Sequence, residues 1–368
     1  MRFHFVVFTL GTICLTACSS TPSNPPVAVQ QASKAHAHPI QYAKNFSCVK
    51  SECIYVTNPV VNPPAIGGSI DVYPANANGN VAPVQVISGA ATGLTSPWGV
   101  AVDKKHNIYA GNNNFGYQAT PSITIYPAGT NGNKPPMKTI TSTQLFSPTA
   151  LTVNSKYQIY VDDAPGNTKL HALRVFARNA SGNWTQIRAI TGNNTLISSP
   201  VGVALYRKVV YVLNQGNVNQ VALLSFGATG TGNIAPGTNV AGGTAFTFPY
   251  ADGVAVSSAG TAYVVNHPYF VDQWGCPTST SVGGGQVVGF PYGATGNVAP
   301  TVTISGNLTG FISPCSDAVD KAGRIYVTDT AANAIYVFAA NANGNVAPIQ
   351  VIQGPNTQLA NPEDIAVF

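Results

Sequence analysis

The sequence is poor in charged residues, which make up only 8% of its 368 positions. The formal net charge of +5 is scattered thinly, and no run of Lys and Arg is interleaved with aromatic residues. Proteins that follow a nucleic-acid backbone need such a basic patch, so we expect no nucleic-acid partner. With so few charges, stability is expected to come from sheet and turn contacts rather than from surface ion pairs, and helices should be nearly absent.

Motifs of common catalytic and metal sites are also lacking. The sequence has no Gly-x-Ser-x-Gly nucleophile elbow, no His-Glu-x-x-His pair and no phosphate-binding Walker loop. No Cys-x-x-Cys pair occurs, and the 6 His residues are too dispersed for a zinc cluster. His36 and His38 could chelate a metal weakly, as a minor alternative.

What the chain does contain is a repeat, in which short β-branched and aromatic runs return about every fifty residues between Gly, Asn and Pro turns. Three markers recur six times each: a tyrosine in an Ile-Tyr-Val-like run, a proline before a Gly-Val-Ala-Val-like run, and a Gly-Asn pair. The tyrosines are Tyr55, Tyr109, Tyr160, Tyr211, Tyr263 and Tyr326; the prolines are Pro97, Pro148, Pro200, Pro249, Pro314 and Pro362; the pairs begin at Gly79, Gly132, Gly182, Gly232, Gly296 and Gly344. The pattern predicts an all-β fold, a six-bladed β-propeller of four-stranded antiparallel blades.

The repeats also predict how the ring closes. The second repeat divides into strands at 98–103, 107–112, 122–127 and 137–141, and the small residues Gly99 and Ala101 suit its first strand to a crowded central channel. The first repeat begins with a second strand at 53–58, and the last repeat stops after a first strand at 363–368. The C-terminal inner strand should therefore pair with the N-terminal strands and leave no free edge.

The N-terminus resembles a bacterial lipoprotein signal peptide. Arg2 precedes an apolar run at 3–15, too short to span a membrane, and Leu15-Thr16-Ala17-Cys18 is similar to a lipobox. The resemblance implies that residues 1–17 are removed and that Cys18 carries the lipid, palmitate included. Ser19 and Ser20 contain no Asp retention signal, so we expect an outer-membrane location in the cell envelope, facing the periplasm or the exterior. An ordinary secretory signal with a chance cysteine is the alternative.

Residues 18–47, rich in Ser, Pro, Ala and Gln, cannot form a core and are expected to be a flexible tether to the propeller at 48–368. Four cysteines remain after Cys14 and Cys18. In an oxidising compartment we expect two disulfides rather than a metal site, Cys48 with Cys53 at the start of the ring and Cys276 with Cys315 on one face.

A candidate site lies where the six inner strands begin, because these starts share one face of a propeller. The residues at this position are Trp98, Thr149, Val201, Asp252, Cys315 and Glu363. Asp252, Glu363 and the nearby Asp317 and Asp364 would crowd carboxylates around the channel mouth, which suits Ca²⁺ or another divalent cation. Asp317 occupies a slot that holds Val in most repeats, so either it has a partner or the local register shifts by one.

Polar residues also end the second strand of every repeat, behind the mouth: Asn58, Asn112, Asp163, Asn214, Asn266 and Asp329. They could add ligands to a cation, but Asn and Asp at strand ends more simply turn the chain by bonding backbone groups.

The fifth repeat contains a long insertion, 266–286, on the same face. His267, Tyr269, Phe270 and Trp274 could stack on a sugar, a flat ligand or a peptide, since specificity often lies in long loops on a rigid scaffold. The alternative is a lid held by Cys276 that only covers the channel.

The repeat 97–103 with 107–109 resembles NHL-type propeller repeats and the related YVTN type, over roughly residues 53–368. Within that group, gluconolactonase-type lactonases hold a divalent cation at the channel mouth on Glu, Asn and Asp. Glu363 and Asp252 are similar to part of that set, but Thr149 and Val201 stand where Asn is expected. Streptogramin lyases use a His-based metal site, which His267 alone does not reproduce.

We therefore interpret the chain as a monomeric, membrane-anchored binding or scaffold propeller without catalytic activity or cofactor, for a protein, peptide or glycan ligand. The alternative is a metal-dependent lactone or ester hydrolase.

Overall fold

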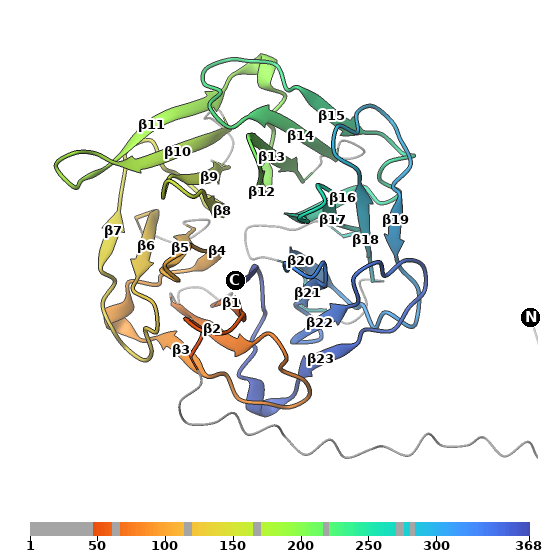
Figure 1. The fold of residues 1–368 in the computed structure, drawn as a ribbon, viewed down its shortest axis with the longest axis horizontal. Coiled ribbons are helices and arrows are strands. Elements are labelled where there is room, and N and C mark those ends of the chain that lie inside the picture. Colours follow the sequence, from red (N-terminus) through yellow and green to blue (C-terminus); the bar gives the residue numbers. More distant parts are fainter. Residues whose placement is uncertain are drawn as a thin grey trace, which may run out of the picture. The chain divides into compact units, whose positions relative to one another are not determined.

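The strands form six antiparallel sheets of four strands each, arranged as blades around a ring (Figure 1). The computed structural model describes residues 47–60, 67–113, 120–164, 171–215, 221–269, 276–279 and 284–368. The chain divides into two compact units, Met1–Ala37 and His38–Phe368, and all described residues belong to the second. The six-bladed β-propeller predicted from the repeats is confirmed, with strand limits that differ from the predicted ones by at most two residues.

The strands of each blade are named here from the channel outward. Blade 1 holds β24 (Ile365–Val367), β1 (Cys53–Pro59), β2 (Gly68–Pro74) and β3 (Gln85–Ser88); blade 2 holds β4 (Pro97–Val102), β5 (Ile108–Asn112), β6 (Ser122–Tyr126) and β7 (Lys138–Ile140). Blade 3 holds β8 (Pro148–Val153), β9 (Ile159–Asp163), β10 (Ala172–Arg178) and β11 (Trp184–Thr191); blade 4 holds β12 (Pro200–Tyr206), β13 (Val209–Asn214), β14 (Ala222–Gly227) and β15 (Thr238–Ala241). Blade 5 holds β16 (Tyr250–Val256), β17 (Ala262–His267), β18 (Gln286–Phe290) and β19 (Val302–Ile304); blade 6 holds β20 (Pro314–Val319), β21 (Ile325–Asp329), β22 (Ala334–Phe338) and β23 (Gln350–Gln353).

The inner strands pack closely around the channel because their sequences supply small residues there. A Cβ atom on Gly99 would lie 2.9 Å from the carbonyl oxygen of Thr149 on the next inner strand. The inner strands of blades 2 to 6 also share a register shift near their start, as between Pro97 and Gly99 in β4. In these five blades the bulge therefore lies where the inner strand leaves the channel mouth.

Blade 1 is completed by both ends of the ring, as the sequence predicts. β24 pairs antiparallel with β1, with Tyr55 opposite Ala366. The amide of Cys53 donates to the carbonyl of Phe368 (2.9 Å), and the amide of Phe368 donates back (3.0 Å). The first and last strands therefore close the ring without an unpaired inner edge.

The core lies between neighbouring blades. Between blades 6 and 1, for example, Ile54 and Tyr73 pack with Tyr326, Ile335 and Ile365 in one buried cluster. Both faces of each sheet are therefore buried against other blades, which explains why the strand residues are apolar on both faces.

The polar residues at the ends of the second strands have a structural task. Asn112 Oδ1 accepts a hydrogen bond from the amide of Thr95 (3.0 Å), and Asp163 Oδ1 accepts from the amides of Phe146 and Ser147 (2.9 and 2.7 Å). Asn58, Asn214, Asn266 and Asp329 accept equivalent bonds from the connection that leads into an inner strand. These contacts agree with a structural role in bonding the backbone rather than with a role as cation ligands. The bonded amides belong to the connection that leads into an inner strand, not to the turn that follows the second strand.

Helical structure in the described residues is limited to three single turns of 3-10 helix, η1 (Ala90–Thr92), η2 (Asn193–Thr195) and η3 (Pro355–Thr357). None of these turns has the length or apolar character to cross a membrane.

Candidate functional site

The residues after the inner-strand prolines converge at the channel mouth. Its lining is Trp98, Thr149, Ala150, Val201, Asp252, Cys315, Ser316, Glu363 and Asp364. These residues enclose a cavity of about 20 Å³, which is room for about one water molecule. All the residues expected at the mouth except Asp317 therefore meet there, but the space between them is too small for a sugar or a lactone ring.

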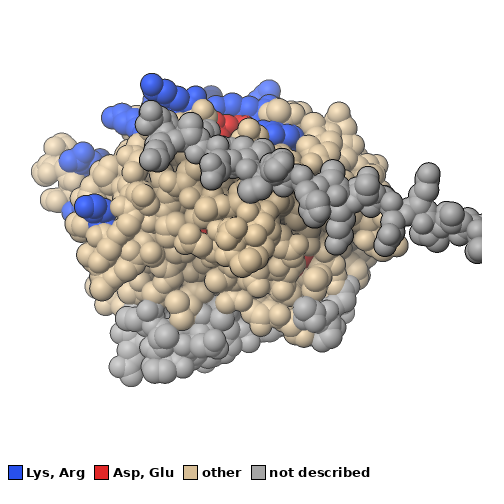
Figure 2. Space-filling view, turned by 90° about the horizontal axis from the view of Figure 1, so that it is seen from below, with Lys and Arg blue, Asp and Glu red and all other residues tan. Residues whose placement is uncertain are grey.

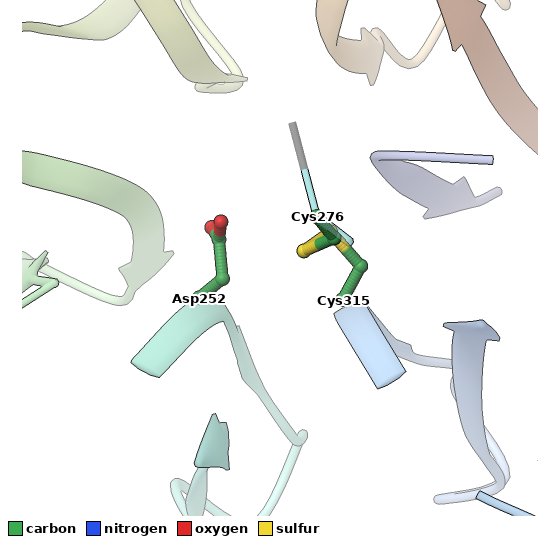
Figure 3. Close-up of side chains that lie close together, drawn as sticks. All are labelled: Asp252, Cys276 and Cys315. Atoms are coloured by element: carbon green, nitrogen blue, oxygen red, sulfur yellow. A yellow bond between two sulfur atoms is a disulfide. The ribbon is translucent and has the colours of Figure 1, made fainter. Parts of the chain in front are cut away.

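A disulfide occupies one side of this mouth. Cys276 of the blade 5 insertion is bonded to Cys315 of β20, and the Asp252 carboxyl group lies beside the two sulfur atoms (Figure 3). The carboxylate and sulfur atoms of these three residues lie within 4.8 Å of one another. Because the sulfurs are bonded to each other, they are not thiolate ligands in this state.

Glu363 holds the disulfide in place. Its Oε1 accepts a hydrogen bond from the backbone amide of Cys276 (2.9 Å), and its Oε2 lies 2.9 Å from Sγ of Cys315. Cys276 is thereby fixed to the C-terminal segment through its backbone amide and to β20 through its disulfide. Glu363 thus links the insertion of blade 5 to the segment that closes the ring.

The two aspartates of the mouth are bonded to neighbouring chain segments. Asp364 accepts from the amide of Val100 (2.8 Å) and from the hydroxyl of Ser316 (2.7 Å), and burial raises its pKa to about 6. Asp252 accepts from the amide of Gly253 (2.9 Å). Burial, and then the nearby Asp364 and Asp162 carboxylates, raise the pKa of Asp252 well above its usual range. Both carboxyl groups therefore bind a proton more tightly than a solvent-exposed Asp does.

Asp317 lies one step deeper, in a channel of about 540 Å³ lined by the inner strands and by Asp364. It pairs with Val327 of β21 as Val254 pairs with Val264 of β17, so the register is not shifted and that alternative is wrong. Asp317 is only 4% exposed, and neither carboxylate oxygen has a hydrogen-bond partner in another described residue. Burial, and then Asp364 and Asp252, raise its pKa well above the usual range. The cost of burying the Asp317 carboxyl group is therefore not offset by a hydrogen bond from another described residue.

A fifth carboxyl group, Asp162, was missed by the sequence analysis. It is fully buried on β9, where its Oδ1 accepts from the amide and hydroxyl of Thr149 (3.2 and 2.8 Å) and from the amide of Ala150 (2.6 Å). Burial raises its pKa to about 8. The sequence does distinguish Asp162. It lies two residues after a repeat tyrosine, and the other repeats hold an uncharged residue there, such as Thr57 or Gly111.

The insertion of blade 5 differs from its prediction. His267 and Tyr269 are 0% and 8% exposed, and their rings stack on each other at 4.1 Å. Burial lowers the pKa of His267 to about 3, and Tyr269 donates to the carbonyl of Pro314. Both rings are therefore buried against each other, and neither is open to a ligand. Phe270 and Trp274 lie outside the described residues, as does Cys18.

The other predicted disulfide, between Cys48 and Cys53, lies far from the mouth. It joins the residues before β1 to its first residue, and both cysteines are buried next to Phe368. This bond fixes the start of the ring at the face opposite the channel mouth.

A divalent cation, which the lactonase resemblance implies, does not fit this donor set. The carboxyl groups at the mouth are those of Asp252, Glu363 and Asp364, and the last two already accept hydrogen bonds. Thr149 and Val201 occupy the positions where Asn is expected, and Cys315 is in a disulfide. Ca²⁺ takes six to eight oxygen ligands. The described residues therefore supply too few ligands for such an ion.

No family model and no curated protein matches this chain. Solved structures match its fold. A Bacteroides caccae protein of unknown function is 8% identical with a TM-score of 0.56, and covers 86% of this chain and 99% of its own. A chain of the nidogen/laminin complex is 13% identical with a TM-score of 0.54, over 86% and 98%. The periplasmic gluconolactonase PpgL of Pseudomonas aeruginosa is 12% identical with a TM-score of 0.52, over 86% and 98%. At these identities the similarity establishes the propeller fold alone.

Proposed function

We propose that this protein is a lipid-anchored propeller of the bacterial cell envelope that binds a protein, peptide or glycan as a monomer and catalyses no reaction. The observation that supports it best is the closed channel mouth, with room for about one water molecule between Trp98, Asp252 and Glu363. A hydrolase needs a site that admits its substrate. At this mouth the carboxyl groups instead contact backbone amides and a disulfide.

The anchor rests on the sequence around Cys18, and fatty-acid labelling in a bacterial host tests it. We expect Cys18→Ser to lose both the incorporated fatty acid and recovery in the membrane fraction, because the thiol is the acylated group. Cys14→Ser is the matched control, since Cys14 belongs to the segment that is removed, and should keep both. Equal labelling of the two variants would disprove the anchor.

Binding without catalysis is tested by capture from envelope extract, with the purified protein assayed in parallel for lactone and ester hydrolysis. We expect one reproducible partner whose binding survives Asp252→Asn and Glu363→Gln, and no hydrolysis above background. Turnover that is lost in either variant would contradict the proposal.

Metal-dependent lactone or ester hydrolysis is the second candidate. It is favoured by the presence of Asp252 and Glu363 in one cavity and by the fold shared with a periplasmic gluconolactonase. The fold does not decide between the candidates, because it also occurs in a chain of the nidogen/laminin complex. The incomplete ligand set makes binding without catalysis the preferred function.

A further inference from the structure

The basic residues of the ring gather on the face opposite the channel mouth. Every inner strand runs from the mouth to this face, so the turns between first and second strands all open there. These turns, with the residues before β1, carry Lys50, Lys104, Lys105, Lys156, Arg207, Lys208, Lys321 and Arg324, which we call the cationic face. Figure 2 views the ring from its edge and shows Lys and Arg along one face and the side next to it. Charges that are scattered along the sequence are thus concentrated in space.

Carboxylates do not neutralise this face. The acidic residues in the described part of the chain are buried or half-buried, and only a little Asp or Glu surface is visible among the cations in Figure 2. Asp103 accepts bonds from two backbone amides, the Asn107 side chain and the Tyr109 hydroxyl, while Asp320 and Glu52 both pair with Arg324. Of the described basic residues, only Arg174 and Arg324 form ion pairs. The lysines of the cationic face therefore present uncompensated charge to the solvent.

A pocket of about 480 Å³ lies on this face between blades 2 and 3. Lys105, Lys138, Lys156 and Arg178 line it, together with Tyr157 and Trp184. Nζ of Lys105 lies 5.2 Å from the centre of the Tyr157 ring. Its one acidic lining residue, Asp103, is 2% exposed and already bonded, so the pocket suits an anionic group of phosphate size or larger.

The first strand of the propeller also begins at the cationic face. Cys53 opens β1 there, tied by its disulfide to Cys48, and the ring of Phe368 lies beside it, 5.5 Å from Nζ of Lys321. Met137, at the edge of the pocket, is 53% exposed. Amphipathic helices that lie on a bilayer interface likewise combine Lys and Arg with apolar and aromatic side chains.

We propose that the cationic face docks on an anionic phospholipid bilayer, with one headgroup phosphate held in the pocket between blades 2 and 3. One part of this proposal rests on the proposed lipid anchor, namely the orientation of the ring. A lipid-anchored chain that enters the ring beside Cys48 would hold the cationic face toward the membrane. The channel mouth would then face away from the bilayer and toward a partner.

Vesicle co-sedimentation of the unit 38–368 tests this docking. That unit lacks Cys18 and closes its own ring, so neither acylation nor the signal segment contributes. We expect binding to equimolar phosphatidylglycerol and phosphatidylcholine at low salt, little binding to phosphatidylcholine alone, and a steep loss of binding as salt is added.

Charge variants place the contact on this face. Each lysine near an anionic surface strengthens binding about fivefold, so Lys104→Gln, Lys105→Gln and Lys156→Gln together should weaken it about a hundredfold. The three Lys→Arg changes should bind like the parent. Lys134→Gln is the matched control and should leave binding unchanged. Lys134 is exposed, but the preceding residues Gly132 and Asn133 bond to Val86 and Ala91, at the outer strand of blade 1 and the turn after it, away from the turns of the cationic face.

Three outcomes would overturn the proposal. The first is equal binding to neutral and anionic vesicles, or a loss of vesicle binding that is the same in Lys134→Gln as in Lys105→Gln. The second is release from vesicles by soluble glycerol phosphate at matched phosphate concentration, which would assign the pocket to a free anion. The third is tighter binding to duplex DNA than to anionic vesicles at the same salt. None of these results bears on the Cys18 labelling experiment, so the two proposals fail separately.

Discussion

Deleting residues 363–368 is expected to abolish cooperative folding of the ring. The deletion removes β24, its pairing with β1 and the reciprocal backbone bonds between Cys53 and Phe368. It also removes Ile365, which is 4% exposed, and exposes Ile54 and Val56, which are fully buried. Each such side chain contributes about 1.5–3 kcal/mol by burial. The sum is comparable with the whole stability of a typical domain, about 5–15 kcal/mol.

Urea unfolding followed by circular dichroism, with limited proteolysis, measures this effect. The control is Ile365→Val, which keeps the strand and should cost only about 1 kcal/mol. A truncated protein that unfolds cooperatively at the parent's midpoint would show that β24 is not needed to close blade 1.

Asp317→Val is expected to stabilise the ring by about 2–4 kcal/mol at pH 8. The substitution restores the residue type that the equivalent slots of β4, β12 and β16 hold, and it removes a carboxylate whose oxygens have no partner in another described residue. Asp317→Asn is the matched comparison, because it removes the charge but leaves a polar group in the same place, and should gain less. Chemical unfolding of the three proteins at pH 8 measures the differences. A less stable Asp317→Val protein would mean that the carboxylate has a structural or binding role.

The pH dependence gives an independent readout of the same residue. Burial raises the folded-state pKa of Asp317 and Asp252 well above 3.8, that of Asp71 to about 7 and that of Asp162 to about 8. A raised carboxyl pKa means that the folded state binds the proton more tightly, so stability falls as pH rises through these values. Below pH 6.5 the buried His267, whose pKa is lowered to about 3, opposes this trend.

The free energy of unfolding should therefore decrease from pH 6.5 to pH 8. The slope should be smaller in both Asp317 variants, because one of the groups that cause it is absent. An increase over this range, or an unchanged slope in both variants, would show that the carboxyl groups are ionised at no cost in the folded ring.

The architecture was predictable because three sequence markers count the same number of blades and each has a local physical cause. The proline lies at or just before the start of the inner strand, the Gly-Asn pair makes a turn with positive φ at the glycine, as at Gly132, and the tyrosine marks the second strand. Closure also followed, since the partial first and last repeats complete one another. These features depend on local sequence and on the geometry of a closed ring.

The site was predictable only in part, for reasons of packing. Trp98, Asp252, Glu363 and Asp364 meet because they occupy one register position or its neighbour. The sequence did not predict that the rings of His267 and Tyr269 are buried and stack on each other, because the repeat pattern does not define the backbone conformation of the insertion. The cationic face was missed because its residues lie in turns about fifty residues apart, which only the ring brings together.

Calorimetric titration of the oxidised unit 38–368 with Ca²⁺ and with Zn²⁺ tests the central claim most directly, namely that the channel mouth is a closed structural site rather than a metal centre. Because the carboxyl groups of Asp252, Glu363 and Asp364 are too few to hold a hard cation and Cys276 is bonded to Cys315, we expect neither heat of binding nor an increase in melting temperature. Binding of one equivalent of metal, with a rise in melting temperature that Asp252→Asn and Glu363→Gln abolish, would contradict it.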